Sequence, residues 1–162
     1  MIHQYFVDLA SNQDNYNEIL SFCKHFINPV GPPTFTRILG NGSNGKSTLV
    51  SILEHLTTAE VIFIDINRFD EHYLNNLDLS KSTILVMVEE QTLFFQPNVK
   101  LIEKLSNYNN LHIVYLANTA EPLGTLNTIV KTLYLMQHIN DAMMFIKLMQ
   151  HTQALREYIN TI

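Results

Sequence analysis

Apolar and polar positions alternate along the chain in two different periods, and these periods predict strands separated by helices. Apolar runs typical of buried strands lie at 34–40, 61–66, 82–88, 111–117 and 128–136. Apolar residues at helical spacing lie at 15–26, 47–56, 70–77, 98–106 and 140–159. Because helices and strands alternate, we expect an α/β fold, a three-layer doubly wound parallel sheet of about five strands with flanking helices.

The length of 162 residues predicts one globular domain over 1–162. We divide it into an N-terminal helical segment 1–33, a core 34–136 and a C-terminal helix 137–162. The polar cluster at 11–14 is expected to cap the helix at 15–26, and the proline-rich segment 28–33 to end it. Residues 1–9 are mixed in character and predict no single structure.

Composition limits which partners and which cellular compartment we expect for this domain. The net charge of −5 gives no support for a surface dominated by nucleic-acid phosphate contacts. Cys23 is the only cysteine, which leaves no intramolecular disulfide and no zinc site built from cysteines. We therefore expect an intracellular, cytoplasmic protein. No segment approaches the ~20 apolar residues of a membrane span, so we expect no membrane partner.

The strongest chemical signal is the stretch Gly40–Thr48, which matches the phosphate-binding loop G-x-x-x-x-G-K-[ST] without a mismatch. Its glycines let successive backbone N–H groups point at one phosphate, Lys46 reaches the β- and γ-phosphates, and Ser47 places its hydroxyl on Mg²⁺. A strand is predicted before it and a helix after it, as this loop requires. The sequence thus predicts ATP and Mg²⁺ as cofactors. The expected nucleotide-binding residues are Gly42, Ser43, Asn44, Gly45, Lys46, Ser47 and Thr48.

Two further candidate positions follow from the rule that ligands bind beyond the carboxyl ends of parallel strands. Glu89 and Glu90 end the strand at 82–88. Glu89 is predicted to bind Mg²⁺ together with Ser47. Either glutamate can activate the attacking water. Only one of the two should face the nucleotide, because adjacent side chains on a strand point to opposite faces. Asn118 ends the strand at 111–117 and is suited to sense the γ-phosphate. The alternatives are a solvated acidic pair and an ordinary turn asparagine.

Asp65 and Arg68, at the end of the strand at 61–66, allow a different function. A carboxylate and an arginine at this place can bind the acceptor of a small nucleoside or nucleotide kinase, although a strand-end turn with a surface ion pair is equally compatible. The seven histidines lie on different elements, and their spacing gives no metal-ligand motif.

The chain resembles the superfamily 3 helicases, particularly the poxvirus-type and phage-type primase-helicases. The resemblance is carried by the phosphate loop Gly40–Thr48, by Leu79–Glu90, which is similar to the family's Walker B segment, and by Leu111–Pro122, which is similar to its motif C with Asn118 as sensor. It implies an AAA+-like ATPase core, a ring of identical subunits, single-stranded DNA as a partner, and a viral or plasmid replication protein acting in the host cell.

This chain departs from the family pattern in two ways. Only positions 91–117 separate Glu90 from Asn118, which leaves little room for the family's DNA-contacting hairpin. No arginine occurs between Arg68 and Arg156, so the expected arginine finger is missing and Lys131 is the nearest basic residue. Since such a finger raises turnover by about 10³–10⁵, we expect slow hydrolysis. The expectation is therefore a Mg-dependent ATPase, with a nucleoside kinase and a non-catalytic ATP-dependent assembly module as alternatives.

Overall fold

The computed structural model describes residues 1–40, 45–89, 100, 104, 107–118, 130–136 and 142–161. The helices are α1 (Ile2–Leu9), α2 (Gln13–Ile27), α3 (Lys46–Glu54), the 3₁₀ helix η1 (Ile66–Arg68), α4 (Glu71–Asn75), α6 (Ala142–Met149) and α7 (Thr152–Asn160). The strands are β1 (Phe35–Leu39), β2 (Glu60–Asp65), β3 (Thr83–Val88), β4 (Leu111–Ala117) and β5 (Val130–Tyr134).

The described strands form one five-stranded sheet in the order β2-β3-β4-β1-β5, and every pairing in it is parallel. This confirms the predicted α/β class and parallel sheet. The strand β4 lies between β1 and β3, in register with Leu39 opposite Ala117 and Val88 opposite Leu116. The carboxyl ends of β1, β4 and β3 therefore lie side by side at one edge of the sheet.

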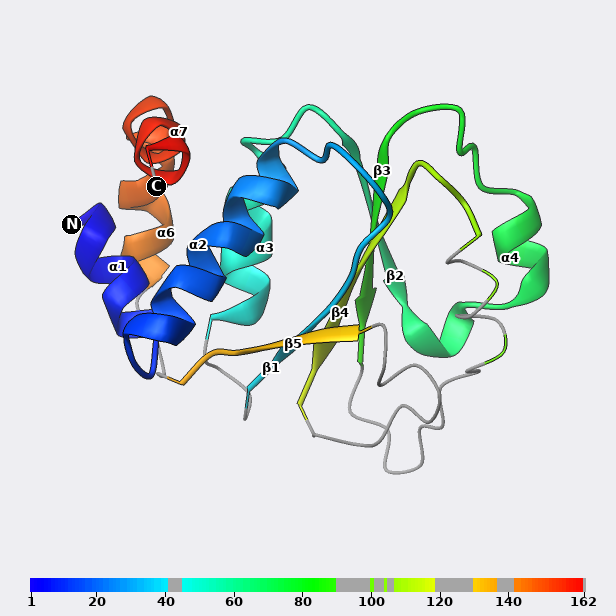
Figure 1. The fold of residues 1–162 in the computed structure, drawn as a ribbon, viewed down its shortest axis with the longest axis horizontal. Coiled ribbons are helices and arrows are strands. Elements are labelled where there is room, and N and C mark those ends of the chain that lie inside the picture. Colours follow the sequence, from blue (N-terminus) through cyan, green and yellow to red (C-terminus); the bar gives the residue numbers. More distant parts are fainter. Residues whose placement is uncertain are drawn as a thin grey trace.

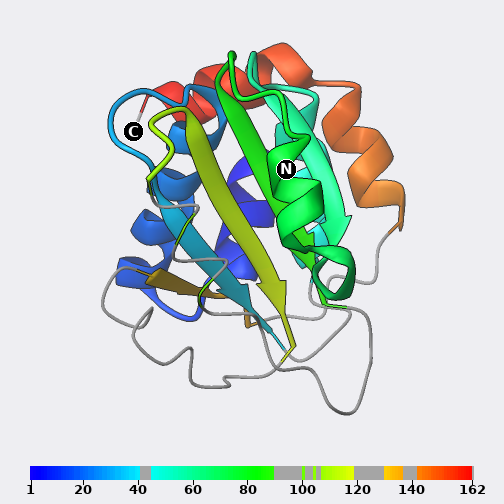
Figure 2. The same cartoon turned by 90° about the vertical axis from the view of Figure 1, so that its right-hand side faces the viewer.

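Helices cover both faces of the sheet, which gives the predicted three layers. Figure 1 shows α1, α2, α3, α6 and α7 on one side and η1 with α4 on the other. In Figure 2 the strands run side by side with α4 in front of them and α2 behind. Alternate residues of the strands belong to separate buried clusters, as the two-residue period of a strand requires. In β3, for example, Ile84 and Val86 pack with the larger group of helices, whereas Leu85 and Met87 pack with η1 and α4.

Side-chain caps mark where two of the predicted helices begin. The Asn12 carboxamide oxygen accepts a hydrogen bond from the Asn15 backbone N–H at 2.9 Å, at the start of α2. The Asp70 carboxylate does the same for the Tyr73 N–H at 2.7 Å, at the start of α4. Such caps satisfy N–H groups that have no partner within the helix, so they fix the first turn.

The C-terminal part of the chain differs from the sequence prediction. The single helix predicted at 140–159 is wrong, because α6 ends at Met149 and α7 begins at Thr152. The chain turns at Gln150 and His151, where the His151 backbone N–H donates to the Leu148 carbonyl at 3.0 Å, three residues back and not four as in a continuing α-helix. The turn redirects the chain (Figure 1), and α7 buries Leu155 and Ile159 completely.

Three further expectations concern the N-terminus, the segment at 98–106 and membrane spans. Residues 2–9, whose pattern predicted no single structure, form α1. The helix predicted at 98–106 lies almost wholly outside the described residues. Among the residues that the structure describes, no helix is long and apolar enough to cross a membrane.

Candidate functional site

The candidate site lies where β1 ends and α3 begins. Gly40 follows β1, and its backbone N–H donates to the Ala117 carbonyl of β4 at 3.3 Å, so the hydrogen bonding between β1 and β4 continues into the first residue of the loop. Gly45 precedes α3 with φ at +83°, a left-handed conformation that favours glycine. Its carbonyl accepts the first hydrogen bond of α3, from the Leu49 N–H at 2.8 Å. The strand expected before a phosphate loop and the helix expected after it are therefore both present.

The Lys46 side chain lies buried against the ends of two strands. Only 7% of the residue is exposed. Its ammonium donates to the Gly40 carbonyl at 2.8 Å and to the Asn118 Oδ1 at 3.0 Å. Lys46 thus joins the start of α3 to the carboxyl ends of β1 and β4.

Glu89 and Asn118 form the next link of the same network. Glu89 follows β3, and its Oε2 accepts a hydrogen bond from the Asn118 backbone N–H at 3.0 Å. The Glu89 backbone N–H in turn donates to the Leu116 carbonyl at 3.3 Å. A chain of contacts therefore runs from the Lys46 ammonium through the side chain and backbone of Asn118 to the Glu89 carboxylate.

The charges of this network influence one another. Burial lowers the pKa of the Lys46 ammonium below its ordinary value, and the neighbouring Glu89 carboxylate partly opposes that shift. Because the net effect lowers the pKa, the surroundings stabilise the Lys46 cation less than water does. An anion that reached this ammonium would therefore gain a strong electrostatic interaction.

The structure places the other predicted residues as follows. Ser47 lies exposed in the first turn of α3, and Thr48 beside it is half-buried. The predicted residues Gly42, Ser43, Asn44 and Glu90 lie outside the described residues. Of the predicted catalytic set, the structure brings together Lys46, Glu89 and Asn118.

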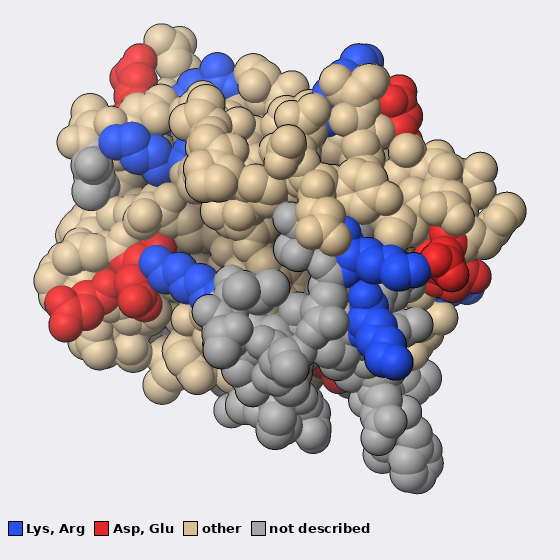
Figure 3. Space-filling model, turned by 45° about the vertical axis from the view of Figure 1, so that its right-hand side comes forward, with Lys and Arg blue, Asp and Glu red and all other residues tan. Residues whose placement is uncertain are grey.

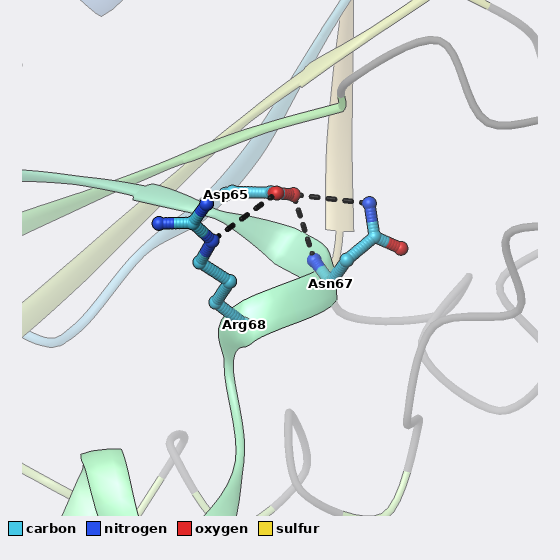
Figure 4. A network of polar contacts seen from close by, with 3 residues as sticks. All are labelled: Asp65, Asn67 and Arg68. Atoms are coloured by element: carbon cyan, nitrogen blue, oxygen red, sulfur yellow. Dashed lines mark hydrogen bonds and ion pairs between the residues drawn. The ribbon is translucent and has the colours of Figure 1, made fainter.

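The pair Asp65 and Arg68 lies at the same carboxyl end of the sheet, after the outermost strand β2, with β3 and β4 between β2 and β1. Asp65 Oδ1 accepts hydrogen bonds from the Asn67 backbone N–H at 2.9 Å and from its side-chain amide at 3.0 Å, which starts η1 (Figure 4). The Arg68 Nε lies 3.9 Å from Asp65 Oδ2, and 82% of the arginine side chain is exposed. These contacts are those of a strand-end turn with a surface ion pair, which was one of the two interpretations of this pair.

The surface is consistent with the acidic composition. On the face shown in Figure 3, the basic side chains of the described residues lie in small groups, several of them beside acidic side chains. Lys104 and Glu71, whose side chains are both exposed, form one ion pair between described residues. Among the described residues, no group of three or more His, Cys, Asp or Glu side chains is arranged to hold a metal ion.

Sequence reasoning found the three side chains of the network and missed how they contact one another. The acceptor role of the Gly40 carbonyl and the hydrogen bond from the Asn118 backbone to Glu89 have no signature in a linear motif. Both contacts depend on β4 lying between β1 and β3. Neither a scan against protein-family models nor a search of curated proteins found a match to this chain.

Proposed function

We propose that this protein is a Mg-dependent P-loop NTPase that binds ATP and hydrolyses it slowly. The proposal includes an AAA+-like core related to the superfamily 3 helicases, acting in viral or plasmid DNA replication. The observation that carries it is the Lys46–Asn118–Glu89 network at the carboxyl edge of the sheet. Three residues from three separate elements meet directly beside the predicted phosphate loop.

Each member of the network has a place in phosphoryl transfer. Lys46 would exchange its contact with Asn118 for the β- and γ-phosphates, since an ammonium in a poorly solvated position binds an anion strongly. The Ser47 hydroxyl and the Glu89 carboxylate would hold Mg²⁺, directly or through its water shell. Glu89 or Glu90 would activate the attacking water.

Asn118 would act as the sensor between these groups. Its Oδ1 accepts from Lys46, so the amide Nδ2 group is the part that can donate to a γ-phosphate or to the attacking water. Its backbone N–H contacts Glu89 at the same time. A single residue would therefore couple the phosphate-binding cation to the carboxylate that handles metal and water.

The sheet order favours this function over a nucleoside kinase. Asp65 ends β2, and β3 and β4 lie between β2 and the phosphate-loop strand β1. Three strand spacings of about 4.8 Å separate Asp65 from the end of β1 by roughly 14 Å. Both carboxylate oxygens of Asp65 already have local partners. A kinase would have to recruit other groups to hold its acceptor.

The test is to measure ATP binding and product formation with the whole chain. We expect Mg·ATP to bind and inorganic phosphate to appear slowly from ATP alone. Phosphate transferred to an added nucleoside would support a kinase instead. Tight ATP binding without any turnover would support an assembly module in which ATP only orders an interface.

Two lysine variants make the test specific. Lys46→Ala should abolish binding or turnover, because it removes the ammonium that contacts both strand ends. Lys81→Ala is the matched control, since Lys81 is exposed in the turn before β3. Unchanged ATP affinity and turnover in Lys46→Ala would overturn the proposal. Sizing by light scattering with and without ATP and single-stranded DNA would test the proposed ring.

A further inference from the structure

Two histidines far apart in the sequence meet at the opposite edge of the sheet from the nucleotide site. His25 lies near the end of α2 and His112 lies near the start of β4, and their nitrogens Nε2 and Nδ1 are 3.1 Å apart. The Thr34 hydroxyl, just before β1, lies 3.2 Å from each of these nitrogens. Three donor atoms from three elements thus form a nearly equilateral triangle.

Hydrogen bonding alone does not account for this triangle. An imidazole nitrogen either donates or accepts a hydrogen bond, depending on its proton, and a hydroxyl has one proton to donate. Whichever tautomers His25 and His112 adopt, at most two of the three contacts can be ordinary two-centre hydrogen bonds. The third contact brings two polar atoms together without a proton of its own between them.

The orientation of the rings indicates where their nitrogens point. In a linear N–H···N bond of 3.1 Å, the ring centroids would be about 5.4 Å apart, because each nitrogen lies about 1.15 Å from its ring centre. The centroids of His25 and His112 are 4.9 Å apart, with the rings at 66°. The rings are therefore not in line with the contact that joins their nitrogens, and a single point beside that contact can lie within reach of both nitrogens.

A metal ion fits at that shared point. With metal–nitrogen distances of about 2.0–2.1 Å and an angle of about 100° at the metal, the nitrogens would be about 3.1 Å apart and the centroids about 4.8 Å apart. The observed separations are 3.1 Å and 4.9 Å. Both distances agree with the same metal position.

The surroundings leave room for a further small ligand. A cavity of about 10 Å³ adjoins the triangle, and that is roughly the space that one water molecule needs. His112 itself is only 4% exposed. His25, Thr34 and His112 line this cavity together with mainly apolar side chains, among them Phe26 and Ile84.

We propose that His25 and His112, with the Thr34 hydroxyl as a third contact, bind one divalent transition-metal ion, with Zn²⁺ as the first choice. Imidazole nitrogen suits Zn²⁺, Ni²⁺ and Cu²⁺, so the two histidines would be the principal ligands, and water would occupy coordination positions that the two imidazoles and the hydroxyl leave open. The ion would join α2 to the amino ends of β1 and β4.

This site is independent of the proposed nucleotide site. Asn118 lies six residue steps beyond His112 along the extended chain of β4, which corresponds to about 20 Å. Lys46→Ala should therefore leave metal binding unchanged, whatever it does to ATP. Loss of one activity without the other distinguishes the two proposals.

The test is calorimetric titration of the untagged, metal-free chain with zinc chloride. We expect one Zn²⁺ per chain with a Kd on the order of 10 μM or tighter. His25→Gln and His112→Gln should each weaken binding at least tenfold, and Thr34→Val should weaken it less. His72→Gln, which changes an exposed histidine on α4, is the control and should have no effect.

A measurement on the unmutated chain covers the case in which a variant fails to fold. Substoichiometric Zn²⁺ should shift the ring nitrogen resonances of His25 and His112 in ¹⁵N NMR spectra and leave the other five histidines in place. No binding up to millimolar zinc would overturn the proposal. So would shifts confined to other histidines, or unchanged affinity in folded His25→Gln and His112→Gln chains.

Discussion

Asn118 offers a test that separates the charge of the site from its packing. The Asn118 Oδ1 lies 3.0 Å from the Lys46 ammonium, and the backbone N–H of the same residue holds Glu89. Asn118→Ala removes the side-chain contact and keeps the backbone one. Asn118→Asp replaces a neutral acceptor by a carboxylate of nearly the same shape in the same position.

The two changes should have very different effects on ATP binding. Because Lys46 would give up its contact with Asn118 when phosphate binds, the affinity lost in Asn118→Ala is that of the amide's proposed hydrogen bond to the γ-phosphate. A hydrogen bond to a charged group is worth about 1.5–3 kcal/mol when it is buried, and less here because Asn118 is half-buried. We expect ATP to bind at most about tenfold more weakly to Asn118→Ala. In Asn118→Asp the new carboxylate holds Lys46 with roughly 5 kcal/mol at an effective dielectric constant of 20, before solvent screening, and repels the γ-phosphate. We expect a loss of about 100-fold or more, which corresponds to about 2.7 kcal/mol.

The assay is calorimetric titration of Mg·ATP into each purified variant, with circular dichroism to verify the fold. Asn107→Asp is the control, because it makes the same charge change at an exposed position before β4, at the far edge of the sheet. Asn118→Asp should bind ATP at least tenfold more weakly than Asn118→Ala. If the two variants bind ATP equally well, Asn118 does not lie beside the bound phosphates and the reasoning from the Lys46 contact fails.

Three further predictions concern stability. Gly45→Ala should lower the free energy of unfolding by about 1–2 kcal/mol, because alanine is strained at a φ of +83°; an unchanged midpoint in thermal denaturation would contradict this. Asn12→Ala should cost about 1 kcal/mol through loss of the α2 cap, measured by urea denaturation, and a cost below a few tenths would show that the cap contributes little. Burial lowers the pKa of both His25 and His112 below 6.5. As the pH falls below about 6.5 the unfolded chain binds these protons before the folded chain does, so stability should fall there. His112→Asn should flatten that dependence in metal-free buffer, and an equally steep dependence would contradict the assignment.

The fold was largely predictable because apolar residues are spaced differently along its strands and along its helices. The strand predicted at 111–117 matches β4 residue for residue, since both faces of β4 are covered and its residues are buried without a break. The two helices at the C-terminus were not separated, because α6 and α7 share one apolar period and the turn between them has neither glycine nor proline. Local pattern thus predicts which segments are regular, and fails where a tertiary contact decides the direction of the chain.

The arrangement of the site required the strand order, which the sequence pattern does not specify. Glu89 and Asn118 were found because each follows a buried strand, but alternating strands and helices are compatible with several orders of a parallel sheet. If β3 lay next to β1, Asn118 would not lie between Lys46 and Glu89. With β4 inserted between them, one residue bonds to both the cation and the carboxylate. A phosphate that displaced Asn118 from Lys46 would therefore act on the residue whose backbone also bonds to Glu89, and in the proposed function this would link nucleotide binding directly to the Glu89 carboxylate.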